Sequence, residues 1–264
     1  MHNKFKRIYI EITNVCNLNC SFCQETKRPA HYLTLQEFSH ICDEVSKYTS
    51  FIYLHVKGEP LLHPQLDEIL RIAKEHRLTV NITTNGTLLN KSLPILLANP
   101  VHQINMSFHS AADNAVIDFD EYVIKLFDTI RTIHDNTKTE MSLRLWTSSD
   151  KPEMFGINNV KVLDRLHINI ATPFEWPDIN NSYFNECGTC QGLRTHIAIL
   201  CDGSVVPCCL DGNGVMTLGN IFKDSLETIL NSERARNFSF DFSSKRYARE
   251  ALCKHCSFKE RFNK

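Results

Sequence analysis

The chain has 264 residues, of which 42% are hydrophobic, enough for a sizeable core in one large domain or in a large and a small one. Its 29 basic and 30 acidic residues give a net charge of -1, which provides no electrostatic argument for a nucleic-acid partner or an anionic membrane. The first residues lack the apolar core of a signal peptide, and no stretch approaches the roughly 18 apolar residues that span a bilayer. We therefore expect a cytoplasmic protein with no nucleic-acid partner and no membrane partner.

Alternating strand-like and helix-like segments fill residues 7 to 171. Short runs of β-branched and large apolar residues predict strands at 7–12, 51–56, 79–83, 103–108, 141–146 and 167–171. Helices are expected between them at 35–48, 64–76, 87–98, 116–135 and 159–166, and Thr34 with Glu37 forms a capping box for the first. These repeats predict an α/β fold, an open or partial (β/α)6 TIM-like barrel whose ligands bind at the carboxyl ends of the strands.

The cysteines fall into two groups. Eleven cysteines in a chain without a signal peptide favour metal binding or redox chemistry over a disulfide framework. Three lie between residues 16 and 23, one is at 42, and seven lie between 187 and 256. This clustering predicts two metal-binding regions.

The first group follows the first predicted strand, with Cys16, Cys20 and Cys23 at C-x3-C-x2-C spacing. Three closely spaced thiolates can ligate three irons of a 4Fe–4S cluster and leave the fourth iron open to a small molecule. From this stretch alone, the alternatives are a zinc site completed by a distant fourth ligand and three unrelated core cysteines.

This spacing, with the aromatic Phe22 just before the third cysteine, resembles the signature of the radical S-adenosylmethionine (radical SAM) enzymes. The resemblance covers residues 7 to 260 and implies the same partial barrel. It further implies that a cluster on Cys16, Cys20 and Cys23 binds SAM. An electron from that cluster then cleaves SAM to methionine and a 5′-deoxyadenosyl radical, which removes a hydrogen atom from the substrate.

The resemblance also assigns SAM contacts to the segment after the second strand. Gly58, Glu59 and Pro60 resemble the GGE-type motif, which contacts the methionyl amino group of SAM. Lys57 stands where the first glycine of that motif often lies. A plain turn between strand and helix is the alternative for these residues.

Later strand ends carry further candidates. Thr84 and Asn85, in a Thr-Asn-Gly segment, match a position close to SAM, and Ser107 matches the position that contacts the SAM ribose. Arg144 lies inside the fifth strand and needs a partner if it points inward. It is either a contact to SAM or substrate or one half of a buried ion pair.

Residues 172–186 break the alternation with prolines, asparagines and a serine, which predicts a linker between a barrel at 1–171 and a second unit at 187–264. The aromatic residues of the linker either dock it onto the barrel or shape a substrate pocket. Glu175 and Asp178 are candidate catalytic bases there, beside Arg144.

The second unit contains Asp202-Gly203, which predicts a hairpin between strands at 196–201 and 204–208. This hairpin, the segment Leu-Gly-Asn-Ile and the terminal C-x2-C resemble the twitch form of the SPASM region of radical SAM enzymes. The resemblance implies one auxiliary 4Fe–4S cluster, which transfers electrons because no iron is open. Its implied ligands are Cys190, Cys208, Cys253 and Cys256, with Cys187 and Cys209 as alternates. A zinc ribbon built on the two C-x2-C pairs is the alternative.

Within this family, the chain looks most like the SAM-dependent 2-deoxy-scyllo-inosamine dehydrogenases and the anaerobic sulfatase-maturating enzymes. The resemblance implies an oxidoreductase that takes two electrons from a small-molecule alcohol, with the auxiliary cluster as acceptor and a flavodoxin or ferredoxin as electron donor. A peptide or protein maturase is the alternative enzyme. A non-catalytic zinc-binding module is the alternative of another class.

Overall fold

The computed structural model describes residues 4–114, 118–146, 159–171, 173, 176–245 and 247–262. In these residues, ten strands form one mixed sheet in the order β10-β9-β8-β1-β2-β3-β4-β5-β7-β6. The strands are β1 (Arg7–Ile10), β2 (Phe51–Tyr53), β3 (Thr79–Thr84), β4 (Gln103–Ser107), β5 (Glu140–Trp146), β6 (Asn159–Leu163), β7 (Leu166–Ala171), β8 (His196–Ile199), β9 (Ser204–Val206) and β10 (Gly219–Asn220). All six strands predicted for the barrel are present, and they pair in parallel.

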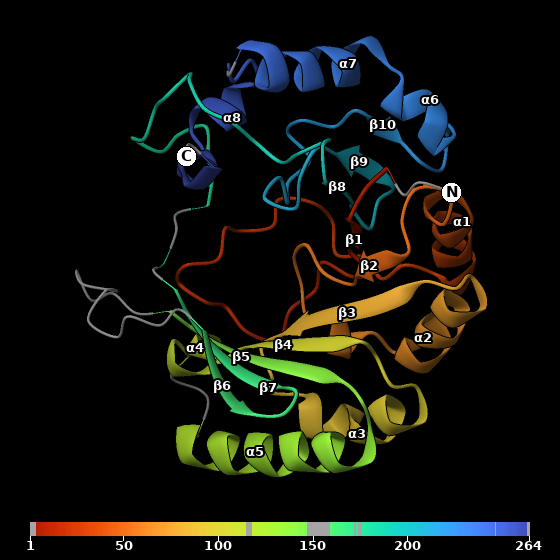
Figure 1. Cartoon of the computed structure of the whole chain (residues 1–264), viewed down its shortest axis with the longest axis vertical. Coiled ribbons are helices and arrows are strands. Elements are labelled where there is room, and N and C mark those ends of the chain that lie inside the picture. Colours follow the sequence, from red (N-terminus) through yellow and green to blue (C-terminus); the bar gives the residue numbers. More distant parts are fainter. Residues whose placement is uncertain are drawn as a thin grey trace.

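The helices lie mainly outside this sheet. They are α1 (Leu35–Val45), α2 (Leu66–Glu75), α3 (Leu89–Ala98), α4 (His109–Ala112), α5 (Phe119–Asn136), α6 (Leu226–Leu230), α7 (Glu233–Phe240) and α8 (Ala251–Lys254), with the shorter turns η1 (Pro60–Leu62), η3 (Asp241–Lys245) and η4 (Ser257–Phe262). Figure 1 shows the strands curving around a central space, with α1, α2, α3 and α5 on the outer side of the sheet. The predicted capping box opens α1, since Thr34 Oγ1 accepts from Glu37 N and Glu37 Oε2 accepts from Thr34 N.

Side-chain alternation divides each barrel strand between two environments. In β1, Ile8 and Ile10 are fully buried in the core beneath the helices, whereas Arg7 and Tyr9 line an internal cavity. The parallel register places Ile8 beside Ile52, so the apolar residues of neighbouring strands lie at the same level. The inward positions of the barrel are therefore polar and aromatic, and they are available to a ligand.

The prediction of a helix at 159–166 is wrong, because this segment forms β6 and the turn into β7. Val160 pairs with Ile168 and Lys161 with His167 in an antiparallel ladder. Arg165, with φ of 59°, makes the turn between the two strands. Valines at alternate positions favour a strand, and the adjacent edge of β7 offers backbone partners that an isolated helix would forgo.

The C-terminal unit continues the barrel sheet. β8 pairs in parallel with β1, from Arg7 beside His196 to Ile10 beside Ile199. The predicted hairpin joins β8 to β9, and Gly203 in its turn has φ of +83°, a conformation that favours glycine. The short helices α6, α7 and α8 follow, at the end of the molecule away from α5 (Figure 1).

Candidate functional site

The long loop between β1 and α1 carries the first three cysteines across the inner side of the curved sheet (Figure 1). Each of their sulfurs lies within hydrogen-bonding range of one side-chain nitrogen. These contacts join Asn85 Nδ2 to Cys16 Sγ at 3.9 Å, Asn114 Nδ2 to Cys20 Sγ at 3.3 Å, and Lys57 Nζ to Cys23 Sγ at 3.4 Å. Because such donors stabilise negatively charged sulfur, this set fits thiolates that ligate an iron–sulfur cluster.

The turn after β2 lies directly against the cysteine loop. Gly58 has φ of +73°, and a Cβ at this position would meet Thr13 O at 2.4 Å and Val15 O at 2.9 Å. Glu59 N donates to Val15 O at 2.8 Å. Glycine is therefore required for both the conformation and the close approach, and the turn fixes the backbone immediately before Cys16.

The Glu59 carboxylate is buried at the edge of the cavity. Its Oε2 accepts from Asn85 N at 2.7 Å and its Oε1 accepts from Leu61 N at 3.0 Å. Burial raises the pKa of Glu59 to about 7, against the lowering effect of these hydrogen bonds. A carboxylate held in this way can accept a further hydrogen bond from an amino group, and Pro60 starts η1 just behind it.

The other candidates for SAM contacts also line this cavity. Thr84 and Asn85 lie at the end of β3, and Ser107 ends β4. Phe22 packs its ring against Trp146, with 4.8 Å between the ring centroids. The ends of β3, β4 and β5 therefore lie together at the cavity with Phe22, the aromatic residue of the cysteine loop.

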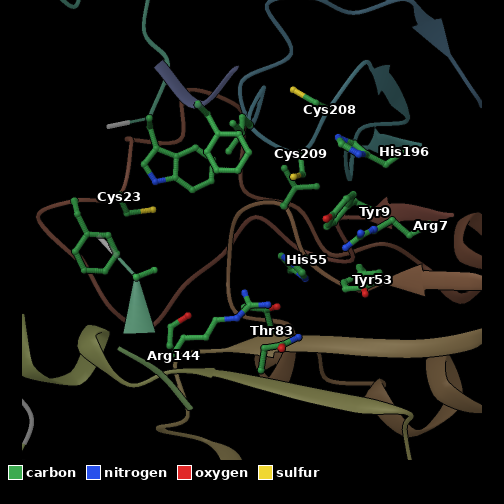
Figure 2. Close-up of a pocket in the computed structure, with 18 of the residues that line it drawn as sticks. Arg7, Tyr9, Cys23, Tyr53, His55, Thr83, Arg144, His196, Cys208 and Cys209 are labelled. Atoms are coloured by element: carbon green, nitrogen blue, oxygen red, sulfur yellow. The ribbon is translucent and has the colours of Figure 1, made fainter. Parts of the chain in front are cut away.

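A cavity of about 840 Å³ connects the two groups of cysteines. Cys16, Cys20 and Cys23 line one part of it, and five cysteines of the C-terminal unit line another: Cys190, Cys208, Cys209, Cys253 and Cys256. Figure 2 shows Cys23 on one side of this space and Cys208 and Cys209 on another. The volume lies within the range of small-molecule binding sites in proteins.

Four cysteines of the C-terminal unit converge at this cavity. The four are Cys190, Cys208, Cys253 and Cys256, and burial raises the pKa of every one of these thiols. For the first three, neighbouring cysteines raise the pKa further. Lys259 lies among them, with Nζ at 3.0 Å from both Cys253 O and Cys256 O. In the described residues, no three His, Cys, Asp or Glu side chains form a site for a single metal ion, whereas a 4Fe–4S cluster takes each thiolate on a different iron.

The two alternate cysteines differ in position. Cys187 is exposed and pairs with Tyr247 in an isolated bridge, and it is not among the described residues that line the cavity. Cys209 does line the cavity, and its thiol shares a hydrogen bond with the Tyr9 hydroxyl. The geometry therefore groups Cys190 rather than Cys187 with the other three, and it places Cys209 beside them.

Of the two catalytic candidates within the described residues, Arg144 lines the cavity and Asp178 does not. Arg144 reaches into the cavity from β5 (Figure 2), and burial lowers the pKa of its guanidinium. Asp178 accepts hydrogen bonds from Gln24 and Asn180, which lower the pKa of its carboxyl. Glu175 lies outside the described residues. Trp176 lines the cavity, with Lys57 Nζ 5.0 Å from its ring centroid.

Sequence reasoning missed several polar residues of the cavity. Arg7 and Tyr9 in β1 and Tyr53 in β2 line it, and Asn114 follows α4 to reach Cys20. The alternation of polar or aromatic residues with isoleucines in β1 carries the signal for Arg7 and Tyr9. No local pattern marks Asn114, because its contact joins segments 94 residues apart.

Comparison with known protein families assigns both halves of the chain. Residues 10–144, just over half of the sequence, match the radical SAM superfamily. This chain belongs to the radical SAM superfamily. Residues 190–257 match SPASM, an iron–sulfur cluster-binding domain, and together these domains imply 4Fe–4S clusters and SAM as cofactors of this radical SAM enzyme.

Curated relatives are similar over part of their length. The AdoMet-dependent heme synthase of Methanosarcina barkeri is 36% identical over 115 residues, which cover 42% of this chain and 33% of that protein. The GTP 3′,8-cyclase of Chlorobaculum tepidum is 35% identical over 104 residues, which cover 38% of this chain and 32% of that protein. The matched segment thus spans about a third of these relatives.

Solved structures share the fold over nearly the whole chain. BtrN in complex with AdoMet and 2-DOIA superposes with a TM-score of 0.67 at 19% identity, over 97% of this chain and 94% of that one. The AdoMet-bound anSMEcpe gives a TM-score of 0.65 at 14% identity, over 98% and 87% of the two chains. SuiB of Streptococcus suis with bound S-adenosylmethionine gives 0.65 at 16% identity, over 99% and 75%. The expected partial barrel with a C-terminal cluster-binding domain is confirmed.

None of the helices in the described ranges has the length and apolar character needed to cross a membrane.

Proposed function

We propose that Cys16, Cys20 and Cys23 hold the 4Fe–4S cluster that binds SAM. We further propose that Cys190, Cys208, Cys253 and Cys256 hold one auxiliary 4Fe–4S cluster. The observation that carries both assignments is the single cavity onto which both groups of cysteines open. In this scheme, residues 1–171 form the SAM-binding barrel, residues 172–186 link it to the second unit, and residues 187–264 carry the auxiliary site.

When bound, the first cluster supplies the electron that cleaves SAM to methionine and a 5′-deoxyadenosyl radical. The chain's own residues would hold SAM in position for this cleavage. Glu59 would accept a hydrogen bond from the methionyl amino group and Ser107 would contact the ribose, while the backbone N–H of Asn85 holds the Glu59 carboxylate in place. Phe22, Gly58, Pro60 and Thr84 complete the surroundings of SAM.

The reaction we favour is the two-electron oxidation of a small-molecule alcohol to a carbonyl compound. In this oxidation the substrate would give up a hydrogen atom, an electron and a proton, and the auxiliary cluster, held by its four cysteines, would supply the electron acceptor. Support comes from the position of the auxiliary cysteines on the same cavity and from the cavity's volume of about 840 Å³, which suits a small molecule. A flavodoxin or ferredoxin is the expected electron donor.

Maturation of a peptide or protein is the second candidate function. The structural relatives include SuiB bound to its precursor peptide SuiA, with a TM-score of 0.56 at 18% identity, beside BtrN with the small molecule 2-DOIA. An extended peptide would enter past the linker, where Trp176 lines the cavity. The small-molecule reading is preferred because each of the barrel strands β1 to β5 contributes side chains to the described lining, which puts the substrate space inside the barrel.

The decisive experiment is anaerobic reconstitution followed by counts of iron, sulfide and zinc per chain. We expect about eight irons in the wild type and about four in Cys16→Ala/Cys20→Ala/Cys23→Ala. About four irons falling to none would remove the auxiliary cluster, and zinc without iron would contradict the enzyme proposal. Deuterated alcohols and peptides would then be incubated with SAM, and transfer of deuterium to 5′-deoxyadenosine would separate the two substrate classes.

A further inference from the structure

Lys259 is a buried lysine that lies between the two C-x2-C segments of the C-terminal unit. It is only 2% exposed, and its ammonium group donates to the backbone of the second segment, at 3.0 Å from both Cys253 O and Cys256 O. Its alkyl stem packs against the first segment, since a Cβ added at Gly188, where φ is +142°, would meet Lys259 Cδ at 3.1 Å. The backbone on both sides of this side chain therefore fixes where its charge lies.

Within the described part of the chain, no carboxylate forms an ion pair with this ammonium group. The carboxylate of the neighbouring Glu260 accepts hydrogen bonds from the Tyr183 hydroxyl at 2.5 Å and from Asn185 Nδ2 at 3.4 Å instead. The Tyr183 ring lies 5.0 Å from Lys259 Nζ, which adds a cation–π contact but no negative charge. An ammonium group that is buried without a counter-charge is costly, so we expect a negatively charged group beside it.

Cysteines are the groups that can provide this negative charge. The side chains whose charge acts on Lys259 are Cys256, Cys253, Glu260 and Cys190. Burial raises the pKa of the Cys190 and Cys256 thiols, and the ammonium group of Lys259 opposes this effect at both. Three of the four proposed ligands of the auxiliary cluster are therefore near enough to Lys259 to interact with its charge. As ligands of iron they are thiolates and negatively charged.

We propose that Lys259 is a positioning residue whose fixed positive charge stabilises the reduced form of the auxiliary cluster and so makes it a better electron acceptor. Reduction adds one electron to a site that four thiolates already make negative, and a positive charge in a site with little water favours the more negative state. This inference rests on the proposed function, in which the substrate is oxidised and supplies that electron. It gives a residue outside the cysteine motifs a part in the direction of electron transfer.

The competing role for Lys259 is structural. Cys253 lies in the last turn of α8, and the carbonyl groups at the end of a helix lack partners within the helix. A neutral donor would satisfy these carbonyl groups as well as an ammonium group does. A glutamine at position 259 keeps an N–H donor without the charge, whereas an arginine keeps the charge. These two substitutions therefore separate the effect of the charge from that of the hydrogen bonds.

The test is a potentiometric titration of the auxiliary cluster, followed by electron paramagnetic resonance, in Cys16→Ala/Cys20→Ala/Cys23→Ala. This full-length variant is expected to hold the auxiliary cluster alone, with about four irons, so that no second signal overlaps. In this background, Lys259→Gln should lower the equilibrium constant for one-electron reduction at least about tenfold, which corresponds to about 59 mV. Lys259→Arg should stay closer to the potential of the parent variant.

The matched control is Lys254→Met, which removes a lysine directly after Cys253. The Lys254 side chain is partly exposed and pairs with Glu186 at 2.6 Å, so its charge is balanced and screened by solvent. We expect this control to keep the potential of the parent variant. Equal potentials in Lys259→Gln and Lys254→Met would overturn the inference. Equal falls in Lys259→Arg and Lys259→Gln would also overturn it, because the charge would then have no effect.

Iron counts decide the case in which a substitution removes the cluster. Loss of iron from Lys259→Gln, with about four irons kept in Lys259→Arg, would support the inference, because the charge would then be needed even to hold the cluster. Loss of iron from both would assign Lys259 to packing and overturn the inference alone. Absence of iron from the parent triple variant would instead contradict the auxiliary cluster itself, and with it the proposed function.

Discussion

Lys57 Nζ lies 3.4 Å from the sulfur of Cys23, so the turn after β2 reaches the third cysteine of the loop. Lys57 is only 4% exposed, and its side chain also contacts Gln24 O and packs against Gly212 of the C-terminal unit. In the described residues no carboxylate pairs with this ammonium group. Cys23 as a thiolate would provide its counter-charge.

Lys57→Met should lower the reduction potential of the SAM-binding cluster. Hydrogen bonds and positive charge near the sulfurs stabilise the reduced, more negative cluster, and the methionine removes both while keeping most of the volume. If the contact is worth about 1.5 to 3 kcal/mol, the potential falls by roughly 60 to 130 mV. Potentiometric titration followed by electron paramagnetic resonance measures this shift. Lys74→Met, on the exposed side of α2, is the control. An unchanged potential in Lys57→Met would refute the charge effect.

Glu59→Gln should remove a pH dependence of stability. Burial raises the pKa of Glu59 from 4.5 to about 7, so the folded protein holds this proton more tightly than the unfolded chain. The resulting stabilisation is complete below about pH 4.5 and is lost as the pH rises through 7, a difference on the order of 3 kcal/mol. Urea unfolding at pH 5 and pH 8, with clusters but without SAM, measures it. We expect the wild type to lose more stability between these pH values than Glu59→Gln, and equal losses would contradict the buried-acid interpretation.

Gly58→Ala should damage the SAM-binding cluster site far more than a matched substitution elsewhere. Gly58 and Gly214 share φ of +73°, so alanine costs about 1 to 2 kcal/mol of backbone strain at either position. At Gly58 the new Cβ would also meet Thr13 O at 2.4 Å, whereas at Gly214 the nearest atom is Thr217 Oγ1 at 3.1 Å. Measuring the free energy of unfolding and the iron content of both variants distinguishes the effect of backbone strain from that of the steric clash. Similar values for the two would show that the cysteine loop moves aside at little cost.

Cys190→Ala and Cys187→Ala distinguish the two candidates for one ligand position. We expect Cys190→Ala to lose the auxiliary cluster and fall from about eight irons to about four, because Cys190 lies among the other three cysteines. Cys187→Ala should keep about eight irons, since Cys187 is exposed and outside the described cavity lining. Iron counts and the absorbance of the reconstituted variants decide, and the reverse pattern would exchange the two assignments.

Local signals predicted the parts of the fold that depend on local chemistry. The six barrel strands, the capping box at Thr34 and the hairpin at Gly203 all follow from residues a few positions apart. The helix predicted at 159–166 is wrong because pairing with β7 decides the conformation of this segment, and a short segment carries little intrinsic preference.

The site was predictable where motifs mark the strand ends and unpredictable where distant segments meet. The spacing of Cys16, Cys20 and Cys23 marks the first cluster site, whereas the approach of Lys57 to Cys23 follows only from the folded backbone. The cavity also depends on tertiary structure, because each of the strands β1 to β5 contributes to its lining. A single sequence shows which residues can bind, but only the sheet shows which of them share a surface.

The pairing of β8 with β1 has a consequence for any attempt to divide the protein. Truncation after the linker would strip β1 of its neighbour and leave a row of backbone N–H and C=O groups exposed along an apolar strand. An exposed strand edge of this kind pairs with strands of other molecules, so the isolated barrel should aggregate rather than stay folded and active. The two parts of the chain are therefore expected to fold together, as one cooperative unit.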